Sequence, residues 1–418
     1  MPNNRIYLCL AHMSEAGLEQ KYIKEAFDTN WVVPLGPNVN AFEKDLEEFC
    51  GQSKRVVALS AGTAAVHLAL IACGVKPGDE VCVQSFTFCA SSHPITYLGA
   101  TPIFIDSEKD TWNMDPGLLE EAIKDRIAKT GRKPKAIVPV ALYGMPYNVD
   151  KIMAIANKYD IPVIEDAAEG FGSRWKGQVL GTFGKYGVLS FNGNKMITTS
   201  GGGALVTANE EEWREIMMYA TQYRESYPYY QHEKIGFNYR MSNICAGIGR
   251  GQMTVANEHI AHHKHVQKMY EELLADVPGI HVHSQPATGE YDSNYWLCTI
   301  TLDSDLKIKG QENAYKTIVT GAVGGAAGVI HAATSATTDC QPNDNVEALR
   351  VFMDAAGIEA RPVWKPMHKQ PVYKNCPAYV NGVSEAVFKV GMCLPAGPYV
   401  KDDDVRYIVA KIKEAIVG

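Results

Sequence analysis

Apolar residues in the first half of the chain alternate between two patterns, which predict strands and helices in turn. Short apolar runs bounded by Gly, Pro or Asp predict buried strands, and apolar residues three or four positions apart predict amphipathic helices. The predicted strands cover residues 55–60, 80–84, 101–106, 136–141, 161–166, 188–191 and 203–207. The predicted helices cover residues 14–30, with Ser14 as N-cap, 39–50, 61–70, 115–130, 149–159 and 210–222. Repeated β–α units of this kind favour an α/β fold, in which helices cover both faces of a mostly parallel sheet.

The pattern changes in the second half of the chain. Residues 245–275 have helical spacing and predict one long helix or two in succession. The rest mixes predicted strands with predicted helices, at residues 281–283, 295–300, 346–356 and 405–417. Such a mixture is typical of a smaller α+β domain. We therefore predict a large domain over residues 1–255 and a small C-terminal domain over residues 256–418.

Composition and charge narrow the class of protein. The chain has 418 residues and a net charge of −7, which makes nucleic acid an unfavourable partner. The N-terminus lacks the apolar core of a signal peptide, and the apolar run at 318–330 is too short and too rich in Gly to span a membrane. The ten cysteines are scattered without a Cys-x-x-Cys pair. We expect free thiols in a cytoplasmic protein that binds neither nucleic acid nor membrane.

A lysine between two predicted buried strands is the first candidate for chemistry. Lys195 ends the segment Ser190-Phe-Asn-Gly-Asn-Lys and is followed closely by Gly201-Gly202-Gly203. A buried ammonium is costly unless it has a partner or loses its charge. A lysine that forms an imine with an aldehyde avoids this cost, and nearby glycines allow a flat ring to approach the backbone. This arrangement suits a Schiff-base lysine for pyridoxal 5'-phosphate.

Two further features support this cofactor. Asp166 ends a predicted strand 29 residues before Lys195 in the sequence. A carboxylate beside a pyridine nitrogen favours the protonated ring, which is a strong electron sink. The turn at Gly62-Thr63 opens a predicted helix and aims free backbone N–H groups at the space before it, as a phosphate site requires. Taken singly, Asp166 would more often cap a turn and Lys195 would more often be an exposed loop residue. Together the three features favour pyridoxal phosphate.

Four histidines close together raise the alternative of a metal site. They are His259, His262, His263 and His265, and some share one face of a predicted helix. Only Glu258 among nearby residues could complete a ligand set. We therefore predict a solvated helix and no metal site.

Six segments of the chain match a known family in order. They are Gly62-Thr63-Ala64-Ala65, Ser85-Phe86-Thr87-Phe88, Val163 to Glu169, Ser190 to Lys195, Gly201-Gly202-Gly203 and Gly236 to Arg240. With these segments the chain resembles the DegT/DnrJ/EryC1/StrS sugar aminotransferases, which are pyridoxal phosphate enzymes of fold type I. Residues 307–343 depart from the compact pattern of that family, and we interpret them as an insertion in the small domain.

The resemblance implies roles for individual residues. Lys195 would form the Schiff base and move protons, and Asp166 would pair with the pyridine nitrogen. The other implied cofactor contacts are Gly62, Thr63 and Ser190 at the phosphate, Phe88 on the ring, Asn192 in the lysine segment, Glu169 where the family often has Gln or His, and Asn238, which would reach the phosphate of the neighbouring subunit. The resemblance therefore also implies a homodimer with shared active sites.

The substrate is expected at the small domain. The segment Arg361 to Gln370 resembles the substrate-facing segment of family members that aminate UDP-linked 4-keto-6-deoxy sugars. An indole can stack on a ring, a cation can meet a phosphate, and an imidazole can bond a hydroxyl. The substrate residues expected on these grounds, or from their place in a matching segment, are Arg240, Trp364, Lys365 and His368.

The predicted activity is transfer of an amino group from L-glutamate to a nucleotide-linked keto-sugar, for cell-surface polysaccharide or glycan biosynthesis. The preferred acceptor is a UDP-4-keto-6-deoxyhexose. Two alternatives remain: an aminotransferase for a keto-cyclitol or other small ketone, and a regulator that binds pyridoxal phosphate without turnover. A related dehydratase branch lacks the Schiff-base lysine, so the presence of Lys195 disfavours it.

Overall fold

The structure, a computed structural model, describes residues 5–51, 53–315 and 340–417. Its main sheet consists of two four-stranded groups that meet at β4 and β5, where Ile137 bridges to Val163 and Val140 bridges to Asp166. In order across the sheet the strands are β1 (Arg55–Leu59), β9 (Gly203–Thr207), β8 (Tyr186–Ser190), β5 (Ile164–Asp166), β4 (Ile137–Val138), β2 (Glu80–Gln84), β3 (Thr101–Ile105) and β14 (Ala378–Tyr379). Only β9 runs antiparallel to its neighbours in this series. The predicted fold class, a mostly parallel sheet within an α/β fold, is confirmed.

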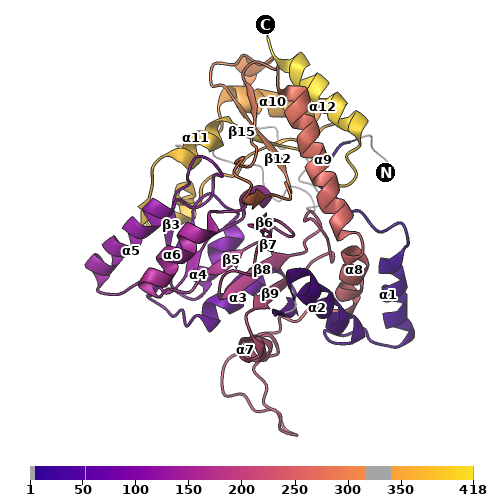
Figure 1. Cartoon of the computed structure of the whole chain (residues 1–418), viewed down its shortest axis with the longest axis vertical. Coiled ribbons are helices and arrows are strands. Elements are labelled where there is room, and N and C mark those ends of the chain that lie inside the picture. The colour runs from indigo at the N-terminus through magenta and orange to yellow at the C-terminus, as the bar shows by residue number, and fades with distance from the viewer. Residues whose placement is uncertain (1–4, 52, 316–339, 418) are drawn as a thin grey trace.

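Helices cover both faces of the main sheet, with α2, α5, α6 and α8 packed on one face and α3, α4 and α7 on the other, and Figure 1 shows α5 and α6 toward one end of the sheet and α2 and α8 toward the other. They are α1 (Leu18–Asp28), α2 (Pro37–Cys50), α3 (Gly62–Ala72), α4 (His93–Tyr97), α5 (Pro116–Thr130), α6 (Val149–Tyr159), α7 (Glu210–Ala220) and α8 (Asn243–Met253). Side-chain caps fix several of the starts. The Asp115 carboxylate accepts hydrogen bonds from the backbone N–H groups of Gly117 and Leu118 at the start of α5.

The first helix begins later than predicted. The Ser14 hydroxyl accepts from the Leu18 backbone N–H and donates to the Glu19 carboxylate at 2.6 Å, and Gly17 takes a left-handed conformation before α1. Ser14 therefore lies one turn ahead of the helix.

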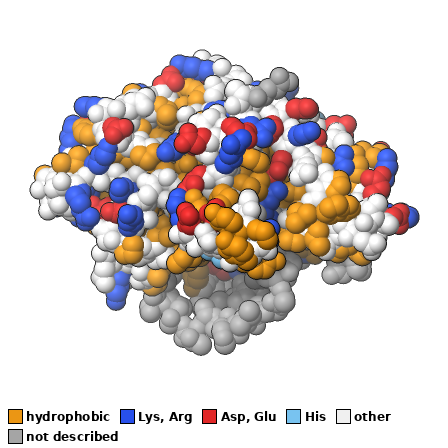
Figure 2. Space-filling model, turned by 90° about the horizontal axis from the view of Figure 1, so that it is seen from below, with side chains coloured by type: hydrophobic (Ala, Val, Ile, Leu, Met, Phe, Trp, Pro, Cys, Tyr) orange, Lys and Arg blue, Asp and Glu red, His pale blue; other side chains and the backbone are white. Residues whose placement is uncertain are grey.

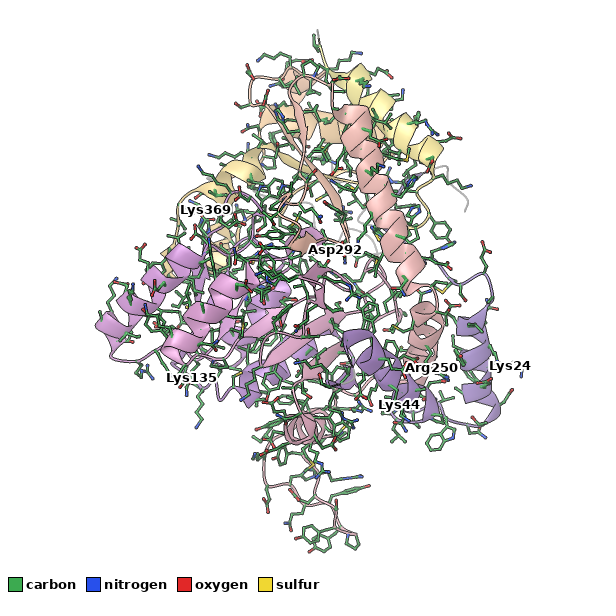
Figure 3. The ribbon with its side chains drawn as sticks, viewed as in Figure 1. Lys24, Lys44, Lys135, Arg250, Asp292 and Lys369 are labelled. Carbon is green, nitrogen blue, oxygen red and sulfur yellow. The ribbon has the colours of Figure 1, made fainter. Side chains whose placement is uncertain are left out.

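Glycines let α8 pack closely against α1 and α2. A Cβ atom added to Gly251 would lie 2.6 Å from the Glu19 backbone nitrogen, which no side chain allows. The Arg250 guanidinium lies 3.9 Å from the centroid of the Tyr22 ring of α1 and donates to the Asn38 side chain of α2 at 3.0 Å. Figure 3 shows Arg250 where these helices meet.

A second, antiparallel sheet lies above the main sheet in Figure 1. Its strands are β10 (Ile280–Val282), β12 (Cys298–Leu302), β15 (Gly391–Leu394) and β13 (Arg361–Pro362). Helices α9 (Ala256–Leu274), α10 (Asp344–Ala355), α11 (Val383–Val390) and α12 (Asp402–Ala415) belong to the same half of the chain. A separate hydrophobic core joins this sheet to α9, α10 and α12.

Three short strands, β6 (Arg174–Trp175), β7 (Gln178–Val179) and β11 (Tyr291–Asp292), form a small sheet that connects the two halves of the chain. The sequence allowed one helix or two over 245–275, and the structure has two, with the break directly before residue 256. The division into domains stays a prediction, and two segments cross it: Ile6 bridges to Ile358, and β14 pairs with β3. Most of the predicted insertion at 307–343 lies outside the described residues.

The predicted solvated helix is wrong for the inner face of α9. His259 and His263 are buried, and their Nδ1 atoms bond the backbone carbonyls of Met196 at 3.2 Å and Tyr295 at 3.1 Å. His265 is exposed and bonds Asp402. The buried histidines therefore tie α9 to the loops beneath it. Among the described residues there is no group of three or more His, Cys, Asp or Glu side chains arranged to hold a metal ion.

Within the described ranges, no helix is both long enough and apolar enough to cross a membrane. No disulfide joins cysteines in the same ranges.

Two histidines with buried ring nitrogens predict acid lability. Burial lowers the pKa of His263 to about 3 and that of His283, whose ring stacks on Trp112 at 3.6 Å, to about 4. The unfolded chain binds these protons below about pH 6.5, so stability present above that pH is lost as the pH falls toward the folded values. We expect the unfolding free energy measured in urea to fall by about 1.4 kcal/mol per pH unit for each histidine.

His283→Phe keeps a ring against Trp112 and removes one titrating group, so the slope should fall by about 1.4 kcal/mol per pH unit. His281→Phe, two positions earlier in β10 and exposed, is the matched control and should keep the slope. Equal slopes for His283→Phe and the unchanged protein would contradict the assignment.

Candidate active site

The predicted site residues meet at one edge of the main sheet. Asp166 ends β5, Ser190 ends β8, and Gly62 begins α3 directly after β1. Lys195 follows in the loop between β8 and β9. Because parallel strands end at the same edge, ligands in such sheets bind there. The sheet order β1-β9-β8-β5 therefore explains why residues far apart in the sequence lie together.

Lys195 is held between a carboxylate and an indole. Its Nζ atom lies 3.2 Å from Glu169 Oε1 and 3.9 Å from the centroid of the Trp296 ring, and its side chain is only 12% exposed. The Trp296 Nε1–H donates to the backbone carbonyl of Asn194 at 2.7 Å, which fixes the indole against the lysine loop. Lys195 is thus a partnered, nearly buried amine at a strand end.

Asp166 is a buried carboxylate with neutral donors. Its Oδ2 accepts from the Ser91 hydroxyl at 2.6 Å and its Oδ1 from the Ala168 backbone N–H at 3.2 Å. Burial raises the pKa of Asp166, while the two donors and the positive charge of Lys195 oppose that rise. A protonated pyridine nitrogen is the kind of partner that a buried carboxylate favours.

A close-packed cradle precedes α3. Ala61, which has no side-chain acceptor, occupies the N-cap, so it leaves the first N–H groups of the helix without a side-chain cap. A Cβ atom on Gly203 would lie 2.4 Å from the Gly62 nitrogen, and one on Gly62 would lie 3.1 Å from the Ser190 Cβ. Glycine at both positions lets the start of α3 lie close to the ends of β1, β8 and β9. Free helix N–H groups suit a phosphate, and the Ser190 hydroxyl lies beside them, 3.3 Å from the position of a Cβ atom on Gly62.

Glu169 contacts the lysine and the backbone at once. Its Oε2 accepts from the Tyr143 N–H at 2.8 Å, opposite the oxygen that faces Lys195. Burial raises the pKa of Glu169 to about 7, while Lys195 and the Tyr143 N–H work against the rise. A carboxyl group with this pKa can take up or release a proton near neutral pH.

Aromatic side chains line the approach to Lys195. Phe88 is 52% exposed and its ring lies 5.5 Å from that of Trp364, which in turn lies 5.0 Å from Tyr143 and 6.2 Å from Trp296. The Tyr143 hydroxyl accepts from the Trp364 backbone N–H at 2.8 Å. The sequence analysis found Phe88 and Trp364 but missed Tyr143 and Trp296, because aromatic residues beside apolar strands usually belong to a core. We call these four residues the aromatic wall.

Two predicted substrate residues already have partners within the chain. The Arg240 side chain is 9% exposed, and it forms an ion pair with Glu43 and donates to the Ala58 carbonyl at 3.1 Å. The His368 side chain is 6% exposed, and its ring bonds Ser85 Oγ at 2.6 Å and Glu385 at 3.3 Å. Both side chains hold the scaffold together, since their polar groups already have partners.

The remaining predicted residues are Asn192, Lys365 and Asn238, and the Asn192 carbonyl accepts from the Lys195 backbone N–H at 2.9 Å. Asn192 is exposed and its side chain donates to Asn194 at 3.3 Å. Lys365 is half-buried beside Trp364 in the segment that leaves β13. Asn238 is exposed on the single chain, where it bridges to Thr221 at the base of the loop after α7.

The model of the DegT/DnrJ/EryC1/StrS aminotransferase family matches residues 14–318 and 311–413. The chain is 42% identical to EpsN of Bacillus subtilis (strain 168), a protein assigned to the pyridoxal phosphate-dependent aminotransferases, over 97% of this chain and 95% of EpsN. It is 34% identical to the GDP-perosamine synthase of Caulobacter vibrioides, over 96% of each chain.

A solved structure gives the same result. The structure of a DegT/DnrJ/EryC1/StrS aminotransferase from Brucella abortus superposes with a TM-score of 0.80 at 26% identity, covering 96% of this chain and 95% of that one. The strand-end lysine, the buried carboxylate and the phosphate cradle are the groups that a pyridoxal phosphate enzyme needs. The chain belongs to the DegT/DnrJ/EryC1/StrS family, and it is a pyridoxal phosphate-dependent sugar aminotransferase.

Proposed function

We propose that this protein transfers the amino group of L-glutamate to C4 of a UDP-linked 4-keto-6-deoxyhexose in the cytoplasm, for the synthesis of a cell-surface polysaccharide. The observation that carries the proposal is the aromatic wall beside Lys195, which continues to Lys365 through Trp364. Aromatic faces suit a sugar ring or a base, and a cation next to them suits a diphosphate.

The chain's residues would divide the work by position. When bound, pyridoxal phosphate supplies the electron sink and carries the amino group between the two substrates. Asp166 would hold its pyridine nitrogen in the protonated form, and the donors of Gly62, Thr63 and Ser190 would hold its phosphate. Phe88 would cover the ring. Lys195 would move the proton at the reacting carbon in both half-reactions.

The nucleotide has a second candidate. The relative at 34% identity is named a GDP-perosamine synthase, which favours a GDP-linked acceptor. The segment from Arg361 to Gln370 supports UDP. A keto-cyclitol or other small ketone would need no diphosphate contact, and a regulator would need no turnover. A comparison of acceptors, together with the Lys365 variant, therefore separates these cases.

A panel of acceptors tests the substrate class. We expect glutamate to bleach the visible absorption of the purified protein, and a UDP-4-keto-6-deoxyhexose to restore it. The GDP-linked sugar and a free keto-cyclitol are measured in parallel, at equal concentration. Faster recovery with the cyclitol than with either nucleotide sugar would overturn the substrate class, and bleaching without recovery by any ketone would favour the regulator.

A lysine variant locates the diphosphate within the same assay. A charge-assisted hydrogen bond contributes about 1.5–3 kcal/mol, so Lys365→Ala should weaken nucleotide-sugar binding by roughly tenfold or more. The glutamate half-reaction should change little, because glutamate carries no diphosphate. Lys374→Ala, an exposed lysine nine positions later, is the matched control. Equal slowing of both half-reactions by Lys365→Ala would show a structural role.

The cofactor-bearing lysine can be identified directly. Borohydride reduction of the loaded protein, followed by peptide mass mapping, should tag Lys195, because it is the amine beside Asp166 and the phosphate cradle. Lys195→Arg should abolish the tag and the visible band together. A tag on another lysine would contradict the assignment.

We also propose a homodimer in which each chain completes the other's site. The loop after α7 projects away from the body in Figure 1, and its Tyr229, Tyr230 and Ile235 side chains are exposed, with Ile235 at 86%. Figure 2 views the molecule from below, the side toward which this loop projects, and shows hydrophobic side chains between charged ones. Exposed apolar side chains on a projecting loop suit a second copy of the chain, and Asn238 at its base is the residue that the family resemblance assigns to the partner's cofactor.

Mixing two inactive variants tests the shared sites. Asn238→Ala and Lys195→Ala chains are refolded or co-expressed together, and heterodimers should recover part of the activity, because one of their two sites has both residues intact. Mixtures that never exceed the parents would contradict shared sites.

A further inference from the structure

The Lys195 amine occupies a defined binding position, which we call the seat. The seat has two parts: the Glu169 carboxylate, 3.2 Å from Nζ, and the Trp296 ring, whose centroid is 3.9 Å from it. Burying an ammonium is costly without a counter-charge, and the face of an indole is the most favourable aromatic surface for a cation. Together the two contacts give the amine a counter-charge and an aromatic face, and they replace most of its contact with solvent.

Both parts of the seat are fixed by groups other than the lysine. The second Glu169 oxygen accepts from the Tyr143 N–H at 2.8 Å, and Tyr143 has a φ of 53°, which is uncommon for a bulky residue. The Trp296 backbone N–H donates to Asn294 Oδ1 at 2.8 Å, and the Trp296 indole N–H donates to Asn194. The seat therefore does not depend on Lys195 for its shape.

A lysine that carries the cofactor must release it and take it back in each catalytic cycle. We propose that Glu169 and Trp296 form the resting site of the Lys195 amine, which it occupies whenever it is not bonded to the cofactor. This inference rests on the proposed function only in taking Lys195 as the cofactor-bearing lysine. It gives Glu169 and Trp296 positioning roles, in that both act through the lysine.

The test measures the reactivity of the Lys195 amine and does not depend on enzyme activity. The full-length chain is prepared without cofactor and, separately, loaded with pyridoxamine phosphate, in which no lysine is bonded to the cofactor. Each form is exposed briefly to acetic anhydride at pH 7, and acetylation of every lysine is read by mass spectrometry. The exposed lysines serve as internal references.

We expect Lys195 to be acetylated slowly in the unchanged protein and roughly tenfold faster in Glu169→Gln, because the isosteric amide keeps the shape of the seat and removes the counter-charge. Trp296→Leu should also raise the rate, and Trp296→Phe should restore most of the protection, because it retains an aromatic face. Trp175→Phe, another buried tryptophan outside the site, is the matched control.

Lys195 acetylation that is equally fast in the unchanged protein and in Glu169→Gln would overturn the resting site. If Trp296→Leu does not fold, as judged by circular dichroism, the Glu169→Gln result decides alone. A borohydride tag at Lys195 with unchanged acetylation would overturn this inference and leave the proposed function intact. Absence of the tag would overturn both.

Discussion

The site depends on one electrostatic constraint: two buried carboxylates and one nearly buried amine share a volume that water hardly enters. Asp166, Glu169 and Lys195 would each be costly there alone. The structure meets the cost with unequal environments. Asp166 has a hydroxyl and a backbone donor and, in the proposed function, would face a cationic ring nitrogen, whereas Glu169 faces the lysine directly. The environments of the two acids differ because their donors come from different parts of the chain. Ser91 donates to Asp166, and Tyr143 donates to Glu169.

The predictable part of the fold was the part where local pattern and burial agree. Strand β2 and helix α6 have the bounds that the sequence predicted, since each is a clear periodic segment between turn residues. The start of α1 differed because Ser14 satisfies a carboxylate as well as the backbone. The prediction for the histidines of α9 was wrong because a polar residue was expected to face solvent. Hydrogen bonds to loop carbonyls offset the cost of their burial, and no periodicity in the sequence reveals those bonds.

The candidate site shows the same division. Lys195, Asp166 and Gly62 could be identified because strand ends, glycine turns and a lysine between buried strands have a recognisable local form. Arg240 and His368 lie in the matching segments too, and in the structure both side chains have partners within the chain. Tyr143 and Trp296 had no local signal, because each reaches the lysine through a contact between distant parts of the chain. Residue type and spacing show which groups are available, and only packing shows which of them are already partnered.

The two ends of the site, one at Lys195 and the other at Lys365 and Phe88, therefore differ in burial and charge. At the lysine, charges are buried and partnered at fixed distances, so the loss of one group leaves another uncompensated. At Lys365 and Phe88, side chains are partly exposed and the surroundings are aromatic, so a group can change there without leaving a buried charge unpaired. Trp364 belongs to both ends, because its ring lies between Phe88 and the Tyr143–Trp296 pair and its backbone N–H is bonded by the Tyr143 hydroxyl. This physical division lets the outer end change without a change at the lysine, and it makes Trp364 and Tyr143, where the two ends join, the place where a change at the outer end would reach the lysine.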